Sequence, residues 1–217
     1  MYNFKYVDKA IWIPIRNDIE DILHKVQDLV RDKFTFSYRF IGSSSRNMIT
    51  CDFNSNIGFD FDVNIYINDD DERYSAKEQK EIIMNALNRI AWQYGYSPCE
   101  NSTRVITIKV KDRPLSRIVH SCDIAIVHDY TDGKGKNGQE YIRFNKRQQT
   151  YTWVAQPKGY NLEKKIKWLK KQLLWNDVRN IYLYKKNVNT DPDKHSRSLF
   201  AEAVNEVCSQ NGYATGR

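Results

Sequence analysis

The stretch 34–68 constrains the fold of this 217-residue chain more than any other part of it. It begins with a strand-like aromatic run, breaks at a Gly-Ser turn that starts at Gly42, and resumes as a second strand over 59–67. Asp60 and Asp62 open that second strand, and most of the alternate positions after them are apolar. Because side chains at i and i+2 of a strand point to the same face, we expect the two carboxylates to converge.

A pair of converging carboxylates indicates a cation site. Two like charges held together repel each other unless a cation lies between them, and Mg²⁺ is the hard divalent ion that carboxylate oxygens favour. The turn just upstream, Gly42-Ser43-Ser44, is suited to an anion, since a helix that begins at Ser43 would present free backbone N–H groups. A phosphate site beside a carboxylate pair indicates metal-dependent phosphoryl chemistry.

The order of these features resembles the DNA polymerase β-like nucleotidyltransferase superfamily: an apolar residue before Gly-Ser, a spacer, then Asp-x-Asp at the start of a strand. The pattern is most similar to the branch of the oligoadenylate synthases and the bacterial cyclic-dinucleotide synthases. The resemblance implies an α+β fold, with a mixed β-sheet core flanked by helices and a short C-terminal helical region. It implies a catalytic core over 1–158 and a helical region over 159–217 that packs on the core.

The superfamily completes its metal site with a third carboxylate from a later strand. Asp123 is the match, because it is a single acid within the apolar run 118–127, where an unpaired charge would be costly. Asp52 lies closer to the Gly-Ser turn than Asp60 does. It lacks a second acid two residues on and is followed by turn-forming residues, so Asp60 and Asp62 are preferred.

The resemblance implies roles for nine positions. The implied catalytic and metal-binding residues are Asp60, Asp62 and Asp123, which would hold Mg²⁺ or Mn²⁺. The implied nucleotide-binding residues are Gly42, Ser43, Ser44, Arg46, Lys186 and Ser198. Lys186 and Ser198 are the nearest matches to a lysine and a serine that contact the donor triphosphate in this branch.

The implied activity is transfer of a nucleoside monophosphate from a nucleoside triphosphate, such as ATP, to a hydroxyl acceptor, with release of pyrophosphate. The acceptor is left open: another nucleotide, an RNA end, a protein side chain or a small molecule. Two alternatives also stay open. In the first alternative, the chain is a catalytically silent nucleotide- or RNA-binding module of the same fold. In the second, its three acids are structural and pair with buried Arg or Lys. The sequence does not set the oligomeric state.

Composition adds broad limits. The net charge of +7 is compatible with nucleotide phosphates or a polyanionic partner. No apolar run approaches the length of a membrane span, and the N-terminus lacks a signal-peptide pattern. The four cysteines are scattered without a CxxC pair, which favours structural thiols in a reducing compartment over disulfides or a zinc site. We therefore expect a cytoplasmic protein without a membrane partner.

Periodicity and capping residues predict the remaining elements. Asn17 is expected to cap a helix that ends near Lys33, and Ser75 to cap a second helix that ends near Gly95. The turn over 68–72, which contains four consecutive acids after Asn68, is interpreted as a solvated charge run. Further strands are expected over 104–111, 117–128, 141–145 and 151–155, a hairpin tip over 132–138, and helices over 161–175, 178–186 and 196–208.

Overall fold

The structure is a computed structural model that describes residues 2–69, 71–133, 135–157, 160 and 162–213. The chain divides into two compact units. The sheet unit comprises Val7–Ile49 and Asn56–Pro157, and the helical unit comprises Met1–Tyr6, Thr50–Ser55 and Lys158–Arg217. The sequence-based division counted residues 1–6 and 50–55 with the core, whereas here they group with the C-terminal helices.

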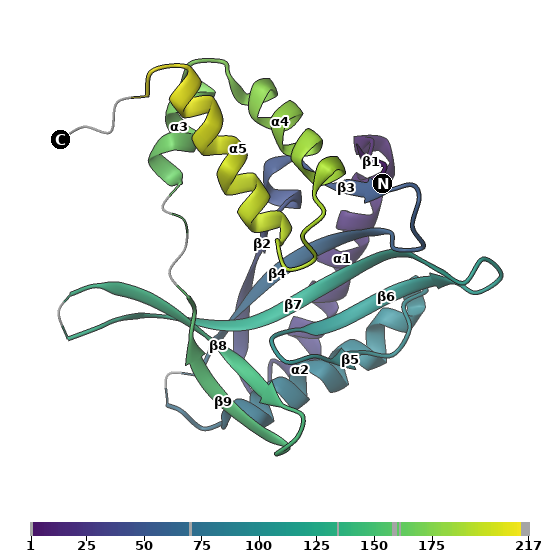
Figure 1. Ribbon diagram of the computed structural model, residues 1–217. Helices are drawn as coiled ribbons and strands as arrows, with labels where there is room; N and C mark the ends of the chain where they lie inside the picture. The colour runs from purple at the N-terminus through teal and green to yellow at the C-terminus, as the bar shows by residue number, and fades with distance from the viewer. Residues whose placement is uncertain (1, 70, 134, 158–159, 161, 214–217) are drawn as a thin grey trace. The chain divides into compact units, whose positions relative to one another are not determined.

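The sheet unit is built on a mixed sheet in the order β2-β4-β7-β6-β5, and β8 and β9 continue it from β7 (Figure 1). The strands are β2 (Thr35–Ile41), β4 (Phe59–Asn68), β5 (Glu100–Asn101), β6 (Ile106–Asp112), β7 (Arg117–Thr131), β8 (Asn137–Asn145) and β9 (Thr150–Ala155). Strands β4 and β7 are parallel, and the other neighbouring pairs are antiparallel. With its flanking helices, this sheet confirms the expected α+β fold.

Two helices, α1 (Lys9–Val30) and α2 (Ala76–Ile90), cover one face of the sheet and lie behind it in Figure 1. Alternate residues of β4 are buried on this side, among them Phe61, Val63 and Ile65. Because the side-chain period of a strand is two, Asp60 and Asp62 belong to the opposite, open face of the sheet. The core under α1 and α2 therefore decides which way the carboxylates point.

Helix α1 begins nine residues earlier than the sequence predicted, so the expected cap at Asn17 is wrong. Asp8 caps the helix instead, and its Oδ1 accepts a hydrogen bond from the Ala10 N–H at 2.8 Å. Pro14 lies within the helix. A proline there removes one backbone donor, but the apolar face that follows it is fully buried, which stabilises the helix through its packing.

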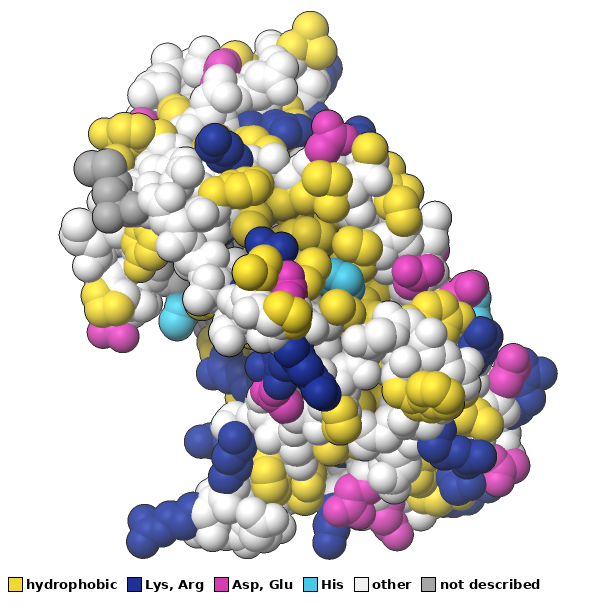
Figure 2. All heavy atoms as spheres, turned by 90° about the vertical axis from the view of Figure 1, so that its right-hand side faces the viewer, with side chains coloured by type: hydrophobic (Ala, Val, Ile, Leu, Met, Phe, Trp, Pro, Cys, Tyr) yellow, Lys and Arg dark blue, Asp and Glu magenta, His cyan; other side chains and the backbone are white. Residues whose placement is uncertain are grey.

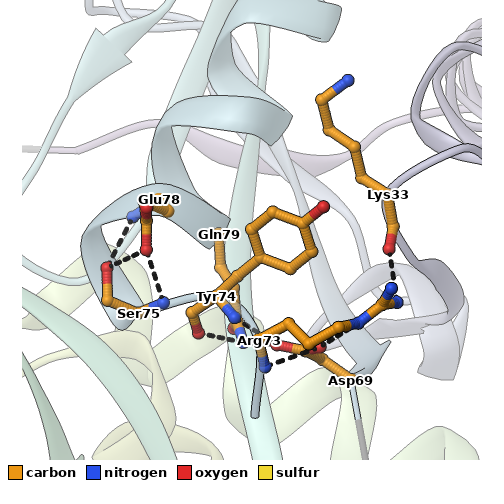
Figure 3. Close-up of polar contacts among 7 residues, drawn as sticks. All are labelled: Lys33, Asp69, Arg73, Tyr74, Ser75, Glu78 and Gln79. Atoms are coloured by element: carbon orange, nitrogen blue, oxygen red, sulfur yellow. Dashed lines mark hydrogen bonds and ion pairs between the residues drawn. The ribbon is translucent and has the colours of Figure 1, made fainter. Parts of the chain in front are cut away.

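Helix α2 begins as predicted at a capping box. The Ser75 hydroxyl accepts from the Glu78 N–H at 3.3 Å, while Glu78 Oε2 accepts from the Ser75 N–H at 2.8 Å (Figure 3). The helix runs into a short 3₁₀ segment, η2 (Ala91–Tyr94), and Gly95 ends it in the left-handed conformation with φ of 82°. The predicted stop at Gly95 is confirmed.

The acidic turn before α2 differs from the expected solvated run. The side chain of Asp69 is only 3% exposed. Its Oδ1 accepts from the Arg73 N–H at 3.2 Å, and its Oδ2 accepts from the Tyr74 N–H at 2.9 Å and from Gln79 Nε2 at 3.3 Å (Figure 3). Asp69 therefore organises the turn, which the charge run alone did not reveal.

The two expected hairpins are confirmed. Strands β7 and β8 pair antiparallel around the tip near Asp132, and β8 pairs antiparallel with β9. Three residues of the predicted segments lie outside the described residues, namely Asp70 of the acidic turn, Lys134 of the hairpin tip and Asn161, the expected cap of the first C-terminal helix.

The helical unit contains α3 (Glu163–Lys171), α4 (Trp175–Val188) and α5 (Ser196–Gln210), close to the predicted ranges, together with the antiparallel pair β1 (Phe4–Tyr6) and β3 (Thr50–Asp52). Hydrogen bonds join β1 to α4: Asn187 Oδ1 accepts from the Phe4 N–H at 2.6 Å, and the Tyr6 hydroxyl donates to the Arg179 carbonyl at 2.8 Å. These contacts explain why the N-terminal strand groups with distant helices.

Surface charge is mixed. On the face shown in Figure 2, Lys and Arg side chains are interspersed with Asp and Glu. Among the described helices, none combines the length and hydropathy that a bilayer span requires.

Candidate active site

The three candidate carboxylates come together through strand register. In the parallel pair β4–β7, Asp62 is the register partner of Asp123, and Asp60 is the partner of Ser121. Register partners share a face of the sheet, so all three acids lie on the open face, away from α1 and α2. The sequence established only that Asp60 and Asp62 share a face; the pairing of β4 with β7 brings Asp123 beside them.

Two hydroxyls from neighbouring strands bind the outer carboxylates. The Ser121 Oγ donates a short hydrogen bond to Asp60 Oδ1. The Thr107 Oγ1 on β6 donates to Asp123 Oδ1 at 2.5 Å, and Thr107 is the register partner of Asp123. Each donor is therefore the residue directly beside its carboxylate on the adjacent strand.

Asp62 is placed differently, by the turn at the end of β2. Gly42 has φ of +63°, in the region that favours glycine. A Cβ atom built on Gly42 would lie 2.0 Å from Asp62 Oδ2, far inside van der Waals contact. Glycine is required here both for its conformation and for the close approach of the backbone to Asp62, so the Gly-Ser turn and the carboxylates meet at one point.

Burial dominates the electrostatics of the cluster, and repulsion between the carboxylates adds to it. The pKa of Asp62 is raised to about 6, first by burial and then by the charges of Asp123 and Asp60, while Arg46 opposes the shift. Burial also raises the pKa of Asp123, against the hydrogen bond from Thr107, which favours its charged form. Such raised pKa values are expected for buried carboxylates that lie close to one another.

The donor set fits a hard divalent cation. Three aspartate carboxylates on adjacent strand positions supply the oxygen ligands that Mg²⁺ and Mn²⁺ prefer. A cation would offset the repulsion among them, which adds to the effect of burial on the pKa of Asp62. As the side chains stand, no group of three His, Cys, Asp or Glu within the described ranges is arranged to hold a metal ion. The three aspartates therefore fit a divalent cation in their residue type, their strand register and their charge.

The Gly-Ser turn leads into a 3₁₀ helix, η1 (Ser44–Arg46), rather than an α-helix. The Ser44 hydroxyl is buried and donates to the Ile41 carbonyl at 3.0 Å, and the Ser45 hydroxyl donates to the Gly42 carbonyl at 2.9 Å. Ser43 precedes η1 and is half-buried. The hydroxyls of Ser44 and Ser45 thus stabilise the turn itself.

The remaining sequence-predicted positions lie in the helical unit. Lys186 Nζ donates to Thr50 Oγ1 at 2.7 Å and lies 3.9 Å from the centre of the Phe4 ring. The Ser198 hydroxyl lies 2.9 Å from the Tyr160 hydroxyl. Contact of either residue with a triphosphate stays a prediction.

Asp52, the carboxylate that the sequence analysis set aside, is also in the helical unit. Its Oδ1 accepts from the Asn3 N–H at 2.8 Å and the Asn54 N–H at 3.1 Å, so it caps the turn after β3.

Sequence reasoning missed three polar residues on the open face beside Asp123. They are Thr107, Ser121 and Lys109, whose Nζ lies 2.6 Å from Glu100 Oε2. Ser121 was within reach of the strand period, because it lies two residues before Asp123 and so shares its face. The positions of Thr107 and Lys109 beside Asp123 follow only from the register of β6 against β7.

Comparison of the sequence with known proteins identifies no family: no protein-family model matches the chain, and no curated protein matches it significantly. Comparison of structures does find similar proteins. The chain is similar to the STING-associated CdnE c-di-GMP synthase from Capnocytophaga granulosa, with a TM-score of 0.60 and 17% identity, covering 97% of this chain and 64% of that one.

Two further synthases show the same likeness. The CdnE cyclic dinucleotide synthase of Elizabethkingia meningoseptica, solved with GTP and Apcpp, gives a TM-score of 0.55 at 12% identity, covering 93% of this chain and 71% of that one. The Vibrio cholerae DncV cyclic AMP-GMP synthase gives 0.56 at 13% identity, covering 91% and 65%.

The chain thus spans between 64% and 71% of the length of these three synthases. At such low identity the likeness concerns the fold. The resemblance seen in the sequence is confirmed at the level of the fold: the protein has the fold of these cyclic dinucleotide synthases.

Proposed function

We propose that this chain is a metal-dependent nucleotidyltransferase, which transfers a nucleoside monophosphate from a nucleoside triphosphate to a hydroxyl acceptor and releases pyrophosphate. The observation that carries the proposal is the convergence of Asp60, Asp62 and Asp123 on one open sheet face beside the Gly42 turn. The fold shared with cyclic dinucleotide synthases, including structures solved with GTP, supports it. An activity that uses triphosphates fits a cytoplasmic location, where these donors are made.

In this proposal the three aspartates are the ligands of Mg²⁺ or Mn²⁺. Such a cation, when bound, supplies charge neutralisation for the triphosphate and lowers the pKa of the acceptor hydroxyl. Asp123 would also take the proton of that hydroxyl as general base.

The Gly-Ser turn would hold the triphosphate. The close approach of Gly42 to Asp62 puts a bare backbone next to the carboxylates, which suits a bound phosphate. Ser43 and the turn amides are the proposed donors, and Arg46 would add a charge-assisted contact. A contact from the Ser44 hydroxyl would require it to leave the Ile41 carbonyl, so its main role here is to stabilise the turn. Lys186 and Ser198 are proposed to contact the donor triphosphate.

The direct test incubates purified protein with Mg²⁺ or Mn²⁺ and each labelled nucleoside triphosphate, alone and in pairs, and with short RNA. Pyrophosphate release and labelled products are followed. We expect metal-dependent turnover that is lost in the double variant Asp60→Asn/Asp62→Asn. The matched control is Asp129→Asn, which neutralises another carboxylate of β7 that bonds Gln139 outside the cluster.

The labelled product identifies the acceptor class. Turnover that persists in the double variant would contradict the proposed role of the aspartates. Metal-independent binding of triphosphate or RNA without turnover in any mixture would instead favour the silent binding module.

A further inference from the structure

The outer two carboxylates of the cluster, Asp60 and Asp123, each have a hydroxyl-bearing residue as a register partner, whereas the middle carboxylate, Asp62, has none. Asp60 and Asp123 each accept a hydroxyl hydrogen bond from their register partner on a neighbouring strand, Ser121 and Thr107. Asp62 has Asp123 and Ile41 as its register partners, neither of which carries a hydroxyl. The two hydroxyls therefore serve the outer carboxylates specifically.

Both hydroxyl-bearing residues are buried, Thr107 at 6% and Ser121 at 7% exposure. A buried hydroxyl needs a partner, and a carboxylate is among the strongest acceptors that it can find. Side chains occupy staggered rotamers, and threonine is further restricted at χ1 because it is β-branched, so a buried hydroxyl that is hydrogen-bonded lies at a defined position. A hydrogen bond to a fixed donor restricts the χ angles of the aspartate that accepts it.

In both pairs the hydroxyl binds Oδ1. A carboxylate has two oxygens, and each contact uses one of them. The second oxygen, Oδ2, is oriented by the same contact, because the carboxylate is planar and its rotation is restricted. Gly42 provides the corresponding restriction at Asp62, where the backbone lies against Oδ2.

We propose that Thr107 and Ser121 are positioning residues, whose buried hydroxyls fix the rotamers of Asp123 and Asp60 so that the second oxygen of each carboxylate is presented to the divalent cation. This inference rests on the proposed function, since it assigns the cluster to a cation. It adds two residues from strands β6 and β7 that hold the ligands without touching the cation themselves.

The test measures Mn²⁺ affinity of the full chain by the electron paramagnetic resonance signal of free Mn²⁺, without nucleotide. Thr107→Val keeps the shape of the side chain and removes the hydroxyl. We expect it to weaken Mn²⁺ binding by about 10-fold or more, as losses of contacts to metal ligands do. Thr107→Ser restores the hydroxyl and is expected to bind within about 3-fold of the wild type. Ser121→Ala tests the Asp60 side in the same way.

The matched control is Thr131→Val, which makes the same chemical change on β7 and removes a hydrogen bond to Asn137 away from the cluster. It should bind Mn²⁺ as the wild type does. Thermal unfolding without metal confirms that each variant is folded at the temperature of the titration. Where Thr107→Val unfolds early, Thr107→Ala and a lower temperature give the same comparison.

The outcomes separate the two proposals. Wild-type Mn²⁺ binding that Thr107→Val and Ser121→Ala leave unchanged would overturn the positioning role, while the proposed function would stand. Weaker binding in Thr107→Ser as well as in Thr107→Val would also overturn it, because loss of packing and not of the hydroxyl would then be responsible. A wild-type protein that binds no Mn²⁺ at millimolar concentration would overturn the proposed metal site and the positioning role together.

Discussion

Two aspartates seven positions apart, Asp62 and Asp69, are both largely withdrawn from water and yet differ in almost every other respect. Both oxygens of Asp69 accept hydrogen bonds, from two backbone amides and the Gln79 side chain. Asp62 instead faces two other carboxylates and the bare backbone of Gly42. The first is a structural acid, satisfied by donors in its own turn. The second has a raised pKa because it is buried beside two other carboxylates.

A dense cluster of acidic residues along the sequence therefore does not by itself indicate a functional site. The run 69–72 is denser in acids than β4, but its buried member stabilises a turn. The carboxylates of β4 and β7 are sparse in sequence and become a cluster through register. Substitutions at both aspartates and at Gly42, and a change of pH, test this contrast.

Asp62→Asn removes a charge from the cluster while keeping the shape of the side chain. We expect metal-dependent turnover to fall on the order of 10³-fold, because the variant loses electrostatic stabilisation in the transition state. Pyrophosphate release measures this. The free energy of unfolding of the metal-free protein should not fall, since the change relieves repulsion. Full turnover in this variant would contradict the functional role of Asp62 and so its difference from Asp69.

Gly42→Ala introduces a Cβ atom at 2.0 Å from Asp62 Oδ2. We expect turnover to fall by about 10²-fold, because a displacement of about 1 Å at a reacting group costs that much. Gly95→Ala is the matched control: Gly95 also has positive φ, but its added Cβ meets nothing within 4 Å. Both variants should lose about 1–2 kcal/mol of stability from backbone strain, and Gly42→Ala alone should lose turnover.

Asp69→Ala leaves the amides of Arg73 and Tyr74 without their acceptor. We expect a loss of about 2–3 kcal/mol in the free energy of unfolding, because three hydrogen bonds to one charged carboxylate are lost together. Denaturant titration measures it, and turnover per folded molecule should be unchanged. Asp71→Ala, an exposed acid of the same turn, should stay within about 0.5 kcal/mol of the wild type. Lost turnover in folded Asp69→Ala would contradict its structural assignment.

The raised pKa of Asp62 predicts the direction in which the stability of the protein changes with pH. Its pKa in the folded protein is raised from 3.8 to about 6, so between these values the unfolded chain is ionised while the folded chain still holds the proton. Stability of the metal-free protein should therefore fall as pH rises through this window, by about 2 kcal/mol relative to Asp62→Asn, and stay level above it. Added Mn²⁺ should reverse the loss in the wild type only. Parallel curves for the two proteins would refute the raised pKa.

Much of the local structure followed from residue patterns. The capping box at Ser75, the stop at Gly95 and the hairpin after β7 depend on contacts within a few residues, which sequence periodicity and turn chemistry describe well. The start of α1 was predicted wrongly, because Asn17 is a plausible cap by type. Asp8 occupies that role through its hydrogen bond to Ala10, and burial of the later apolar face offsets the donor that Pro14 lacks.

That Asp60 and Asp62 share one face of a strand, after a glycine turn, could be predicted from the sequence alone, because both follow from the period of a strand and the conformations open to glycine. Three other features required the packed structure: Asp123 lies beside Asp62, Thr107 and Ser121 bind the outer carboxylates, and the side chain of Asp69 is buried. Strand register is set by the packing of whole apolar faces between segments some 60 residues apart, and no local pattern encodes it.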